Sequence, residues 1–240
     1  MFRDTTDSMT KTIIISLGGS IVAPNKPDKE FLKEFRDTFF SIIESDSSKK
    51  FVFIVGGGGP ARQYQKIYRK ICGSGAEQDQ QDWIGIAATR LNAELIRGIF
   101  VPYCKDAVVT NPYEAEKISG RVLVAAGWKP GFSTDNDAVI LAEKFNSDTV
   151  INLSNISQIY TEDPKINPNA EAIDQISWED FKKMVGDTWE PGKNVPFDPV
   201  ATQKAAEMHC TVITAAGKNL ENTRALLEGR NFIGTVIGPD

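Results

Sequence analysis

Cysteine and histidine are scarce in this sequence. Its 240 residues include three cysteines and one histidine. The cysteines Cys72, Cys104 and Cys210 lie far apart and form no C-x-x-C pair, which argues against a disulfide framework and against a cysteine zinc site. The single histidine, His209, supports no catalytic role. We therefore expect a cytoplasmic protein whose own side chains supply no metal site.

An excess of positive charge and long apolar runs are also missing. The net charge is −5 and the isoelectric point is near 5.1, so no basic surface predicts a nucleic-acid polymer or an anionic membrane as partner. No apolar run is long enough to span a bilayer. Residues 1–11 are polar and lack the apolar core of a signal peptide. We expect a flexible tail there and one domain over residues 12–240.

Short β-branched runs alternate with helical patterns along most of the chain. Nearly continuous apolar runs are typical of parallel strands that helices cover on both faces. The alternation predicts an α/β fold, a three-layer αβα sandwich with a mainly parallel central sheet. The expected strands are Thr12–Leu17, Phe51–Val55, Val122–Ala125, Thr149–Leu153, Thr211–Ala215 and Thr235–Ile237.

Helical periodicity and capping residues mark the segments between these strands. Asp28 is a good N-cap for a helix whose apolar face includes Phe31, Phe35 and Phe39. A second helix carries its apolar residues Ile84, Ala87, Ala88, Leu91, Leu95 and Ile96 on one face. A third opens with Thr134 and Asp137 in capping-box spacing. Further helices are expected from near Ser177, over Asp198–Met208 and over Leu220–Glu228.

Glycine turns follow three of the expected strands. They are Gly18-Gly19-Ser20, the run Gly56–Gly59 and the stretch Gly127–Gly131. Such a turn leading into a helix exposes backbone N–H groups that favour a phosphate, although one turn alone can be a tight connection. Ligands of open α/β sheets bind outside the carboxyl ends of strands. Three turns there predict one site for a phosphorylated ligand.

Two familiar phosphate motifs do not account for these turns. No G-x-x-x-x-G-K-[ST] sequence occurs, which argues against a P-loop. Gly56-x-Gly58-x-x-Ala61 fits the loose dinucleotide pattern of dehydrogenases. That pattern needs a second strand ending in an acid about 20 residues later. Residues 73–82 are instead polar with no strand before them, so a dehydrogenase is disfavoured.

A series of motifs identifies a family more specifically. They are Gly18-Gly19-Ser20, the glycine turn with Ala61-Arg62, Asp82-Trp83-Ile84-Gly85-Ile86 with Thr89-Arg90-Leu91-Asn92-Ala93, Pro130-Gly131 with Ser133-Thr134-Asp135, and Asn155 with Tyr160-Thr161-Glu162-Asp163-Pro164. In this order they resemble the amino acid kinase family, in its archaeal-type UMP kinase branch. The resemblance covers residues 13–237. It implies direct in-line transfer of the γ-phosphoryl group of Mg-ATP to UMP, with no covalent intermediate.

The resemblance also implies residue roles. The N-terminal part of the domain would bind the acceptor and the C-terminal part ATP. The ATP set is Gly19, Ser20, Gly58, Arg62, Ser154, Asn155, Tyr160 and Asp163; the UMP set is Gly57, Asp82, Trp128, Lys129, Pro130, Gly131, Phe132, Ser133 and Thr134. Arg62, Lys129 and Asp135 are the expected catalytic residues. The expected partners are nucleotides and further copies of the chain, from dimer to hexamer.

The sequence departs from the family pattern at positions that should carry charge. Ser16 and Gly59 stand where relatives have lysines, and Asn155–Tyr160 lacks the acid and glycine of N-V-D-G-V-Y. Arg62, Lys129 and Lys11 are candidate replacements for the missing cations. Two alternatives stay open: a kinase of the same fold for another small phosphate or carboxylate, and a protein that binds nucleotide or oxyanions for storage or sensing.

Overall fold

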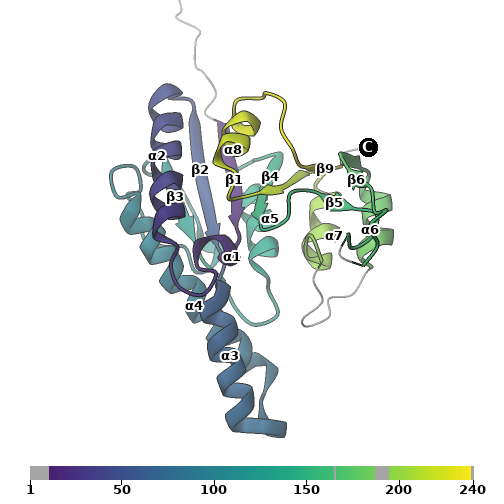
Figure 1. The fold of residues 1–240 in the computed structure, drawn as a ribbon. Helices are drawn as coiled ribbons and strands as arrows, with labels where there is room; N and C mark the ends of the chain where they lie inside the picture. The colour runs from purple at the N-terminus through teal and green to yellow at the C-terminus, as the bar shows by residue number, and fades with distance from the viewer. Residues whose placement is uncertain (1–10, 165, 187–194, 239–240) are drawn as a thin grey trace, which may run out of the picture.

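The computed structural model describes residues 11–164, 166–186 and 195–238 (Figure 1). Within them, seven strands form one sheet in the order β3-β2-β1-β4-β8-β9-β7. All neighbours in this sheet pair in parallel except β8 and β9, which are antiparallel. The strands are β1 (Lys11–Leu17), β2 (Lys49–Val55), β3 (Val122–Ala125), β4 (Thr149–Ser154), β7 (Gln175–Ile176), β8 (Thr211–Ala216) and β9 (Thr235–Ile237).

Helices cover both faces of the sheet, as the alternating residues of β1 show. Ile13, Ile15 and Leu17 belong to a core with residues of α2 (Lys29–Ser45), α4 (Gln78–Ile99), α8 (Leu220–Leu227) and the short α1 (Gly19–Val22). Ile14 belongs to the opposite core, with α5 (Thr134–Lys144), α6 (Trp178–Val185) and α7 (Pro199–Glu207). The expected three-layer αβα sandwich is therefore confirmed.

One helix extends away from the sheet. Only Gly58, Gly59 and Ala61 of α3 (Gly58–Cys72) are buried, and Figure 1 shows the rest of this helix projecting from the body. A short 3₁₀ turn, η1 (Gly73–Gly75), connects it to α4. The first turn of α3 is therefore its fixed part, and it lies at the glycine turn after β2.

The structure refines several expected boundaries. β1 begins at Lys11, one residue early, and residues 1–10 of the expected tail lie outside the described residues. The capping box at Thr134 and Asp137 is wrong, because Ser133 is the N-cap of α5 and accepts a hydrogen bond from the Asn136 N–H (3.1 Å). The pattern did not reveal the short elements α1, η1, η2 (Pro112–Glu114), β5 (Ile159–Tyr160), β6 (Ala172–Ile173) and β7.

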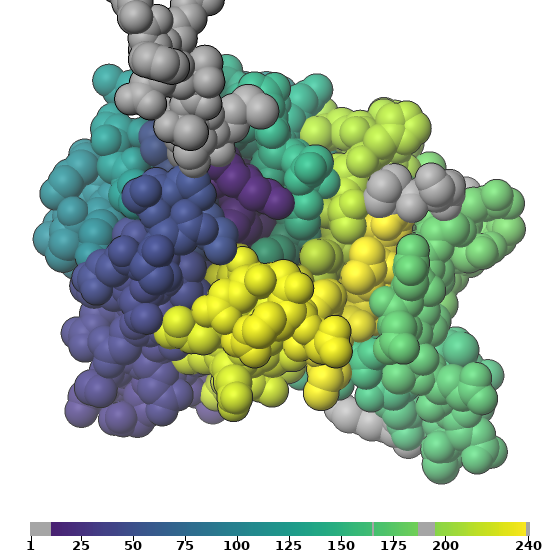
Figure 2. All heavy atoms as spheres, turned by 90° about the horizontal axis from the view of Figure 1, so that it is seen from above, coloured from purple at the N-terminus to yellow at the C-terminus, as the bar shows by residue number. Residues whose placement is uncertain are grey.

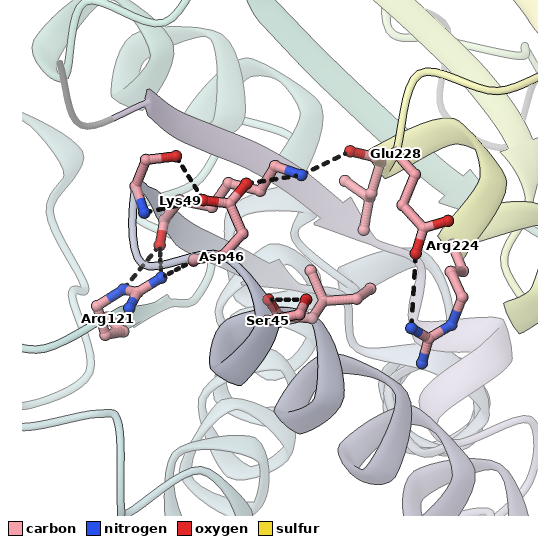
Figure 3. Close-up of polar contacts among 9 residues, drawn as sticks. Ser45, Asp46, Lys49, Arg121, Arg224 and Glu228 are labelled. Carbon is pink, nitrogen blue, oxygen red and sulfur yellow. Dashed lines mark hydrogen bonds and ion pairs between the residues drawn. The ribbon is translucent and has the colours of Figure 1, made fainter. Parts of the chain in front are cut away.

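The end of the sheet remote from the glycine turns is fastened by a polar cluster. Arg121 donates to the carbonyl oxygens of Asp46 and Lys49, and Lys49 pairs with the Asp46 carboxylate (3.2 Å) and donates to the Leu227 carbonyl (3.0 Å) (Figure 3). Figure 2 views this end, with the yellow C-terminal segment beside the blue α2 region. The contacts join the α2–β2 turn to the start of β3 and to α8.

Candidate active site

Two of the glycine turns pack directly against each other. The Gly56 N–H donates to the Leu17 carbonyl (3.0 Å), and a Cβ on Gly19 would lie 2.6 Å from the Gly56 carbonyl carbon. Gly58 has φ +66°, and a Cβ there would overlap the Gly19 and Ala23 carbonyl oxygens. Only glycine allows this approach. The N-terminus of α3, which favours an anion, therefore lies at the carboxyl ends of β1 and β2.

The second and third turns border one cavity of about 360 Å³. It lies between α3, α4, the loop from β3 to α5, and the start of α7. This volume is in the range of small-molecule sites. Six members of the expected UMP set line it: Gly57, Asp82, Gly131, Phe132, Ser133 and Thr134. Gly58 and Arg62, from the expected ATP set, line it as well.

Asp82 connects α4 to the loop that precedes α5. Its Oδ2 accepts a hydrogen bond from the Gly131 N–H (3.1 Å), and its Oδ1 accepts one from Gln78 Nε2 (2.9 Å). Gly131 has φ +80°, in the region that favours glycine. A carboxylate has about four lone-pair positions, so Asp82 keeps acceptor capacity for hydroxyl groups of a ligand.

The N-terminus of α5 presents a second anion-binding position. Ser133 caps this helix, while Ser133 and Thr134 line the cavity. Helix N-termini combine unpaired N–H donors with a partial positive charge. The cavity therefore lies between two helix starts, those of α3 and α5, with an acidic side chain on α4. This combination suits a ligand that carries both a phosphate and hydroxyl groups.

Asp135, in the first turn of α5, connects to β1 and lies close to α7. The Ser16 hydroxyl donates to its Oδ1 (3.0 Å). Burial raises the pKa of Asp135 to about 6; the Ser16 hydrogen bond opposes this shift and the nearby Asp198 carboxylate adds to it. Asp198, 7% exposed, caps α7 by accepting from the Ala201 N–H (2.9 Å) and lines the cavity. Two carboxylates thus lie near the cavity wall.

Asp137 lies two residues further along α5 and is completely buried. Its Oδ2 accepts a hydrogen bond from the Trp128 N–H (3.1 Å), while its Oδ1 has no partner among the described residues. Burial raises the pKa of Asp137 to about 7; the Trp128 N–H opposes the shift and the negative charge of Asp135 adds to it. The carboxyl group supports the loop before α5 and does not line the cavity.

Three members of the expected UMP set lie in the same loop but do not line the cavity: Trp128, Lys129 and Pro130. Lys129 Nζ is 4.0 Å from the ring centre of Trp128 and 5.0 Å from that of Phe132, both cation–π contacts. In this structure Lys129 is therefore held against aromatic rings, whereas Arg62 lines the cavity.

The remaining expected ATP residues lie along the neighbouring strand ends. Gly19 and Ser20 are in α1, and the Gly18 N–H donates to the Leu153 carbonyl (2.9 Å) at the end of β4. Ser154 ends β4, Asn155 follows it, and Tyr160 is in β5. Asp163 follows β5. None of these lines the cavity, so six of the eight expected ATP residues lie outside the cavity that Gly58 and Arg62 line.

Several cavity residues were not predicted from the sequence. Gln65 comes from α3, Gly85, Ile86 and Thr89 from α4, and Asp198 and Val200 from α7 and its cap. Asp198 gave only the signal of a helix N-cap before Pro199. Its approach to Asp135 depends on the packing of α7 against α5, which no local pattern encodes.

The structure also shows the surroundings of the two positions without the expected lysines, Gly59 and Ser16. A Cβ on Gly59 would overlap the Pro24 carbonyl oxygen, so no lysine fits there without movement of the backbone. Ser16 is 3% exposed and uses its hydroxyl on Asp135. Lys11 is the first residue of β1, whereas the glycine turn follows the last residue of this strand. At about 3.3 Å per residue the two ends of β1 are about 20 Å apart. Lys11 is therefore wrong as a replacement, and Arg62 is the best-placed candidate.

Comparison with protein families matches the model of the amino acid kinase family to residues 11–214. Among characterised sequences, uridylate kinase of Archaeoglobus fulgidus is 35% identical over 229 residues, covering 94% of this chain and 99% of the relative. Uridylate kinase of Methanospirillum hungatei is 33% identical over 230 residues, covering 94% of each chain.

Solved structures give the same result for the fold. The crystal structure of uridylate kinase from Archaeoglobus fulgidus superimposes with a TM-score of 0.79 at 33% identity, covering 95% of this chain and all of the other. UMP kinase from Bacillus anthracis gives a TM-score of 0.74 at 20% identity and covers 97% of each chain. No helix among the described residues combines the length and the apolar character needed to cross a membrane.

Proposed function

The chain belongs to the amino acid kinase family, and from that premise we propose that it is a UMP kinase, which transfers the γ-phosphoryl group of ATP to UMP and forms UDP. One observation carries the proposal: the cavity lies between the N-termini of α3 and α5 and is lined by Asp82 and Arg62. A nucleoside monophosphate has the matching groups, an anionic phosphate and neighbouring ribose hydroxyls. The choice of UMP as the acceptor rests on relatives named uridylate kinase, which share about a third of their residues with this chain.

The acceptor would bind with its phosphate at the start of α5. Ser133 and Thr134 supply hydroxyls and helix N–H groups there, while Asp82 accepts from the ribose hydroxyls. Gly57 and the loop from Trp128 to Phe132 would complete this part of the site. The acceptor phosphate needs no activated protein nucleophile, because its own oxygen attacks. The protein has only to align the two phosphates and stabilise the charge of the transition state.

The donor would lie over α1 and the end of β4. Gly19, Ser20, Gly58 and Arg62 would hold its phosphates, and Ser154, Asn155, Tyr160 and Asp163 its nucleoside. The glycine turns after β1 and β2 would present backbone N–H groups to these phosphates. Arg62 supplies positive charge at the cavity, which stabilises charge on the transferring group. Lys129 would join it after leaving the Trp128 and Phe132 rings.

Magnesium would accompany ATP. No group of three or more His, Cys, Asp or Glu side chains arranged for a metal occurs in the described part of the chain. Mg²⁺ binds through few protein ligands and substrate phosphates, so the nucleotide would hold it. The ion supplies charge screening between the phosphates. Asp135 would organise the charges around the transferring group from its place beside Ser16.

We also propose an arrangement for the whole chain. Residues 12–240 would form one domain with acceptor groups in its N-terminal part and ATP groups in its C-terminal part. The protein acts in the cytoplasm as an oligomer, from dimer to hexamer. The exposed apolar side chains of α3 and α4, among them Ile71 (79% exposed) and Leu91 (72% exposed), support self-association.

The test is a product assay with ATP, Mg²⁺ and UMP, followed by the same assay with other acceptors. Formation of UDP, with UMP preferred over AMP, CMP and small carboxylates, is expected. Transfer to a different acceptor would reject UMP while keeping a kinase. Tight nucleotide binding by calorimetry without transfer to any acceptor would indicate a binding protein.

A further inference from the structure

Two polar side chains of α4 are buried, although two leucines of the apolar face expected from the sequence are exposed. Leu91 and Leu95 are 72% and 37% exposed, whereas Thr89 and Asn92 are 7% and 4% exposed. Burying polar side chains costs free energy unless they are hydrogen-bonded. The buried side chains of Thr89 and Asn92 should therefore have hydrogen-bond partners, and these partners indicate the role of the two residues.

The partners are backbone groups of both loops that border the cavity. Asn92 Nδ2 donates to the carbonyl oxygens of Gly56 (2.9 Å) and Gly57 (3.2 Å) in the second glycine turn. Thr89 Oγ1 accepts from the Gly127 N–H (2.9 Å) and donates to the Ile86 carbonyl (2.7 Å) of its own helix. Arg90 Nη2 donates to the Trp128 carbonyl (3.0 Å).

The loop before α5 is thus fixed at two consecutive residues. Gly127 is held through its N–H by Thr89. Both backbone polar groups of Trp128 are hydrogen-bonded. Its carbonyl accepts from Arg90, and its N–H donates to the buried Asp137 of α5. A Cβ on Gly127 would lie 3.0 Å from Thr89 Oγ1, so the loop and α4 are in close contact. After Lys129 and Pro130, the loop continues into residues that line the cavity: Gly131, Phe132, Ser133 and Thr134.

We propose that four side chains are positioning residues: Thr89, Arg90 and Asn92 of α4 and Asp137 of α5. They fix the second glycine turn and the loop before α5 in the relative arrangement that binds UMP. The inference rests on the proposed function for its substrate. Arg90, Asn92 and Asp137 do not line the cavity, and Thr89 borders it with its hydroxyl engaged on Gly127. The four residues act through backbone that would contact the acceptor. Displacement of such backbone by a fraction of an ångström weakens acceptor binding and alignment.

Thr89→Val tests this with a matched control in the same fold. Valine has the shape of threonine but cannot accept from Gly127. Thr223→Val is the control: Thr223 is fully buried in α8 and also donates to a backbone carbonyl of its own helix, that of Asn219 (3.1 Å). Thr89→Ser keeps the hydroxyl and serves as the rescuing variant.

Two readouts are measured on all four proteins. Amide hydrogen exchange of residues 126–133 is expected to accelerate at least about threefold in Thr89→Val, because the Gly127 N–H loses the acceptor that Thr89 provides. Exchange in the other variants should remain as in the wild type. The KM for UMP is expected to rise roughly threefold to tenfold in Thr89→Val only, with the KM for ATP within about twofold of the wild type.

Unchanged exchange in Thr89→Val overturns the inference, whatever the activity. A parallel rise of both KM values, or an equal effect of Thr223→Val, overturns it too, because a general loss of stability would produce either result. Wild-type protein that forms no UDP rejects the proposed function instead, and the exchange readout still decides whether Thr89 fixes the loop.

Discussion

Asp82 is the side chain that we propose as the partner of the acceptor ribose. It already accepts from Gly131 and Gln78, so its removal both frees the loop and deletes the expected partner of the ribose. Asp82→Ala is expected to raise the KM for UMP roughly tenfold to a hundredfold, the range for a hydrogen bond to a charged group. The KM for ATP should stay unchanged in steady-state kinetics.

Asp79→Ala is the matched control, since Asp79 is an exposed acid in the first turn of the same helix. A similar KM for UMP in the two variants would contradict a ribose contact at Asp82.

Asp137 predicts a pH dependence of stability. Burial raises the pKa of Asp137 to about 7 in the folded chain, above the ordinary aspartate value of 3.8. The unfolded chain therefore loses this proton first as the pH rises, and folding becomes less favourable between about pH 4 and pH 7. Asp137→Asn removes this dependence while keeping an acceptor for the Trp128 N–H.

Denaturant unfolding at several pH values measures the effect. The wild type should lose stability over this window with a slope of at most about 1.4 kcal/mol per pH unit, beyond the slope of the variant. Asp135 lies nearby and also has a raised pKa, so its contribution remains in both proteins. Parallel curves for the two proteins would show that Asp137 ionises normally.

Gly59 accounts for one of the missing lysines by geometry. A Cβ there would overlap the Pro24 carbonyl oxygen, whereas a Cβ on Gly98 in α4 would meet nothing within 4 Å. Gly59→Ala should lower the free energy of unfolding by about 1–3 kcal/mol through overpacking. Gly98→Ala should raise it by up to about 1 kcal/mol through helix propensity. Thermal unfolding compares the two; equal effects would contradict the close contact at Gly59.

At the scale of elements, the α2–β2 turn depends on Arg121. The guanidinium group holds two carbonyl oxygens of this turn, and Asp46 beside it has a pKa lowered to about 2, first by the Ser48 hydroxyl and N–H and then by Lys49. Arg121→Met should reduce the free energy of unfolding by about 1–3 kcal/mol, since it leaves half-buried carbonyls without donors.

Arg230→Met provides the comparison for this cluster. Arg230 is exposed and pairs with Glu228 two residues away, and surface pairs contribute little. Its effect should be below about 1 kcal/mol in the same denaturant experiment. An equal decrease in the free energy of unfolding in Arg230→Met and Arg121→Met would contradict the prediction that the α2–β2 turn depends on Arg121.

Elements with strong periodicity could be predicted from the sequence. The six predicted strands exist because buried parallel strands are continuously apolar, and Asp28 caps α2 as expected, accepting from the Phe31 N–H (3.2 Å). Two-residue strands such as β5 and β6 carry no period. Helix α4 shows a deeper limit, since its apolar pattern does not reveal that Thr89 and Asn92 face inward to bind loop backbone.

In the candidate site, too, some features could be predicted from the sequence and others could not. Glycine turns could be predicted to converge because parallel strands place their carboxyl ends at one edge. The approach of Asp198 to Asp135 depends on packing between segments far apart in sequence. Lys129 contacts rings only one and three residues away, those of Trp128 and Phe132, but the sequence does not fix the loop conformation that brings them together.

At the scale of the whole molecule, the exposed apolar side chains of α3 and α4 predict an oligomer. Leu91→Glu is expected to shift the mass measured by light scattering toward the monomer, because it places a charge in a surface that another copy would cover. Ile233→Glu is the control, since Ile233 is 57% exposed on the segment between α8 and β9. A wild-type monomer, or an equal shift in both variants, would contradict the proposed surface.

The central claim is that one α/β domain aligns ATP and UMP across adjacent glycine turns. The most direct measurement is the fate of a γ-labelled phosphate in a mixture of the protein, ATP, Mg²⁺ and UMP. The account predicts labelled UDP, with Arg62→Ala lowering the rate of its formation. Label that remains in ATP, or appears only as inorganic phosphate, would contradict it.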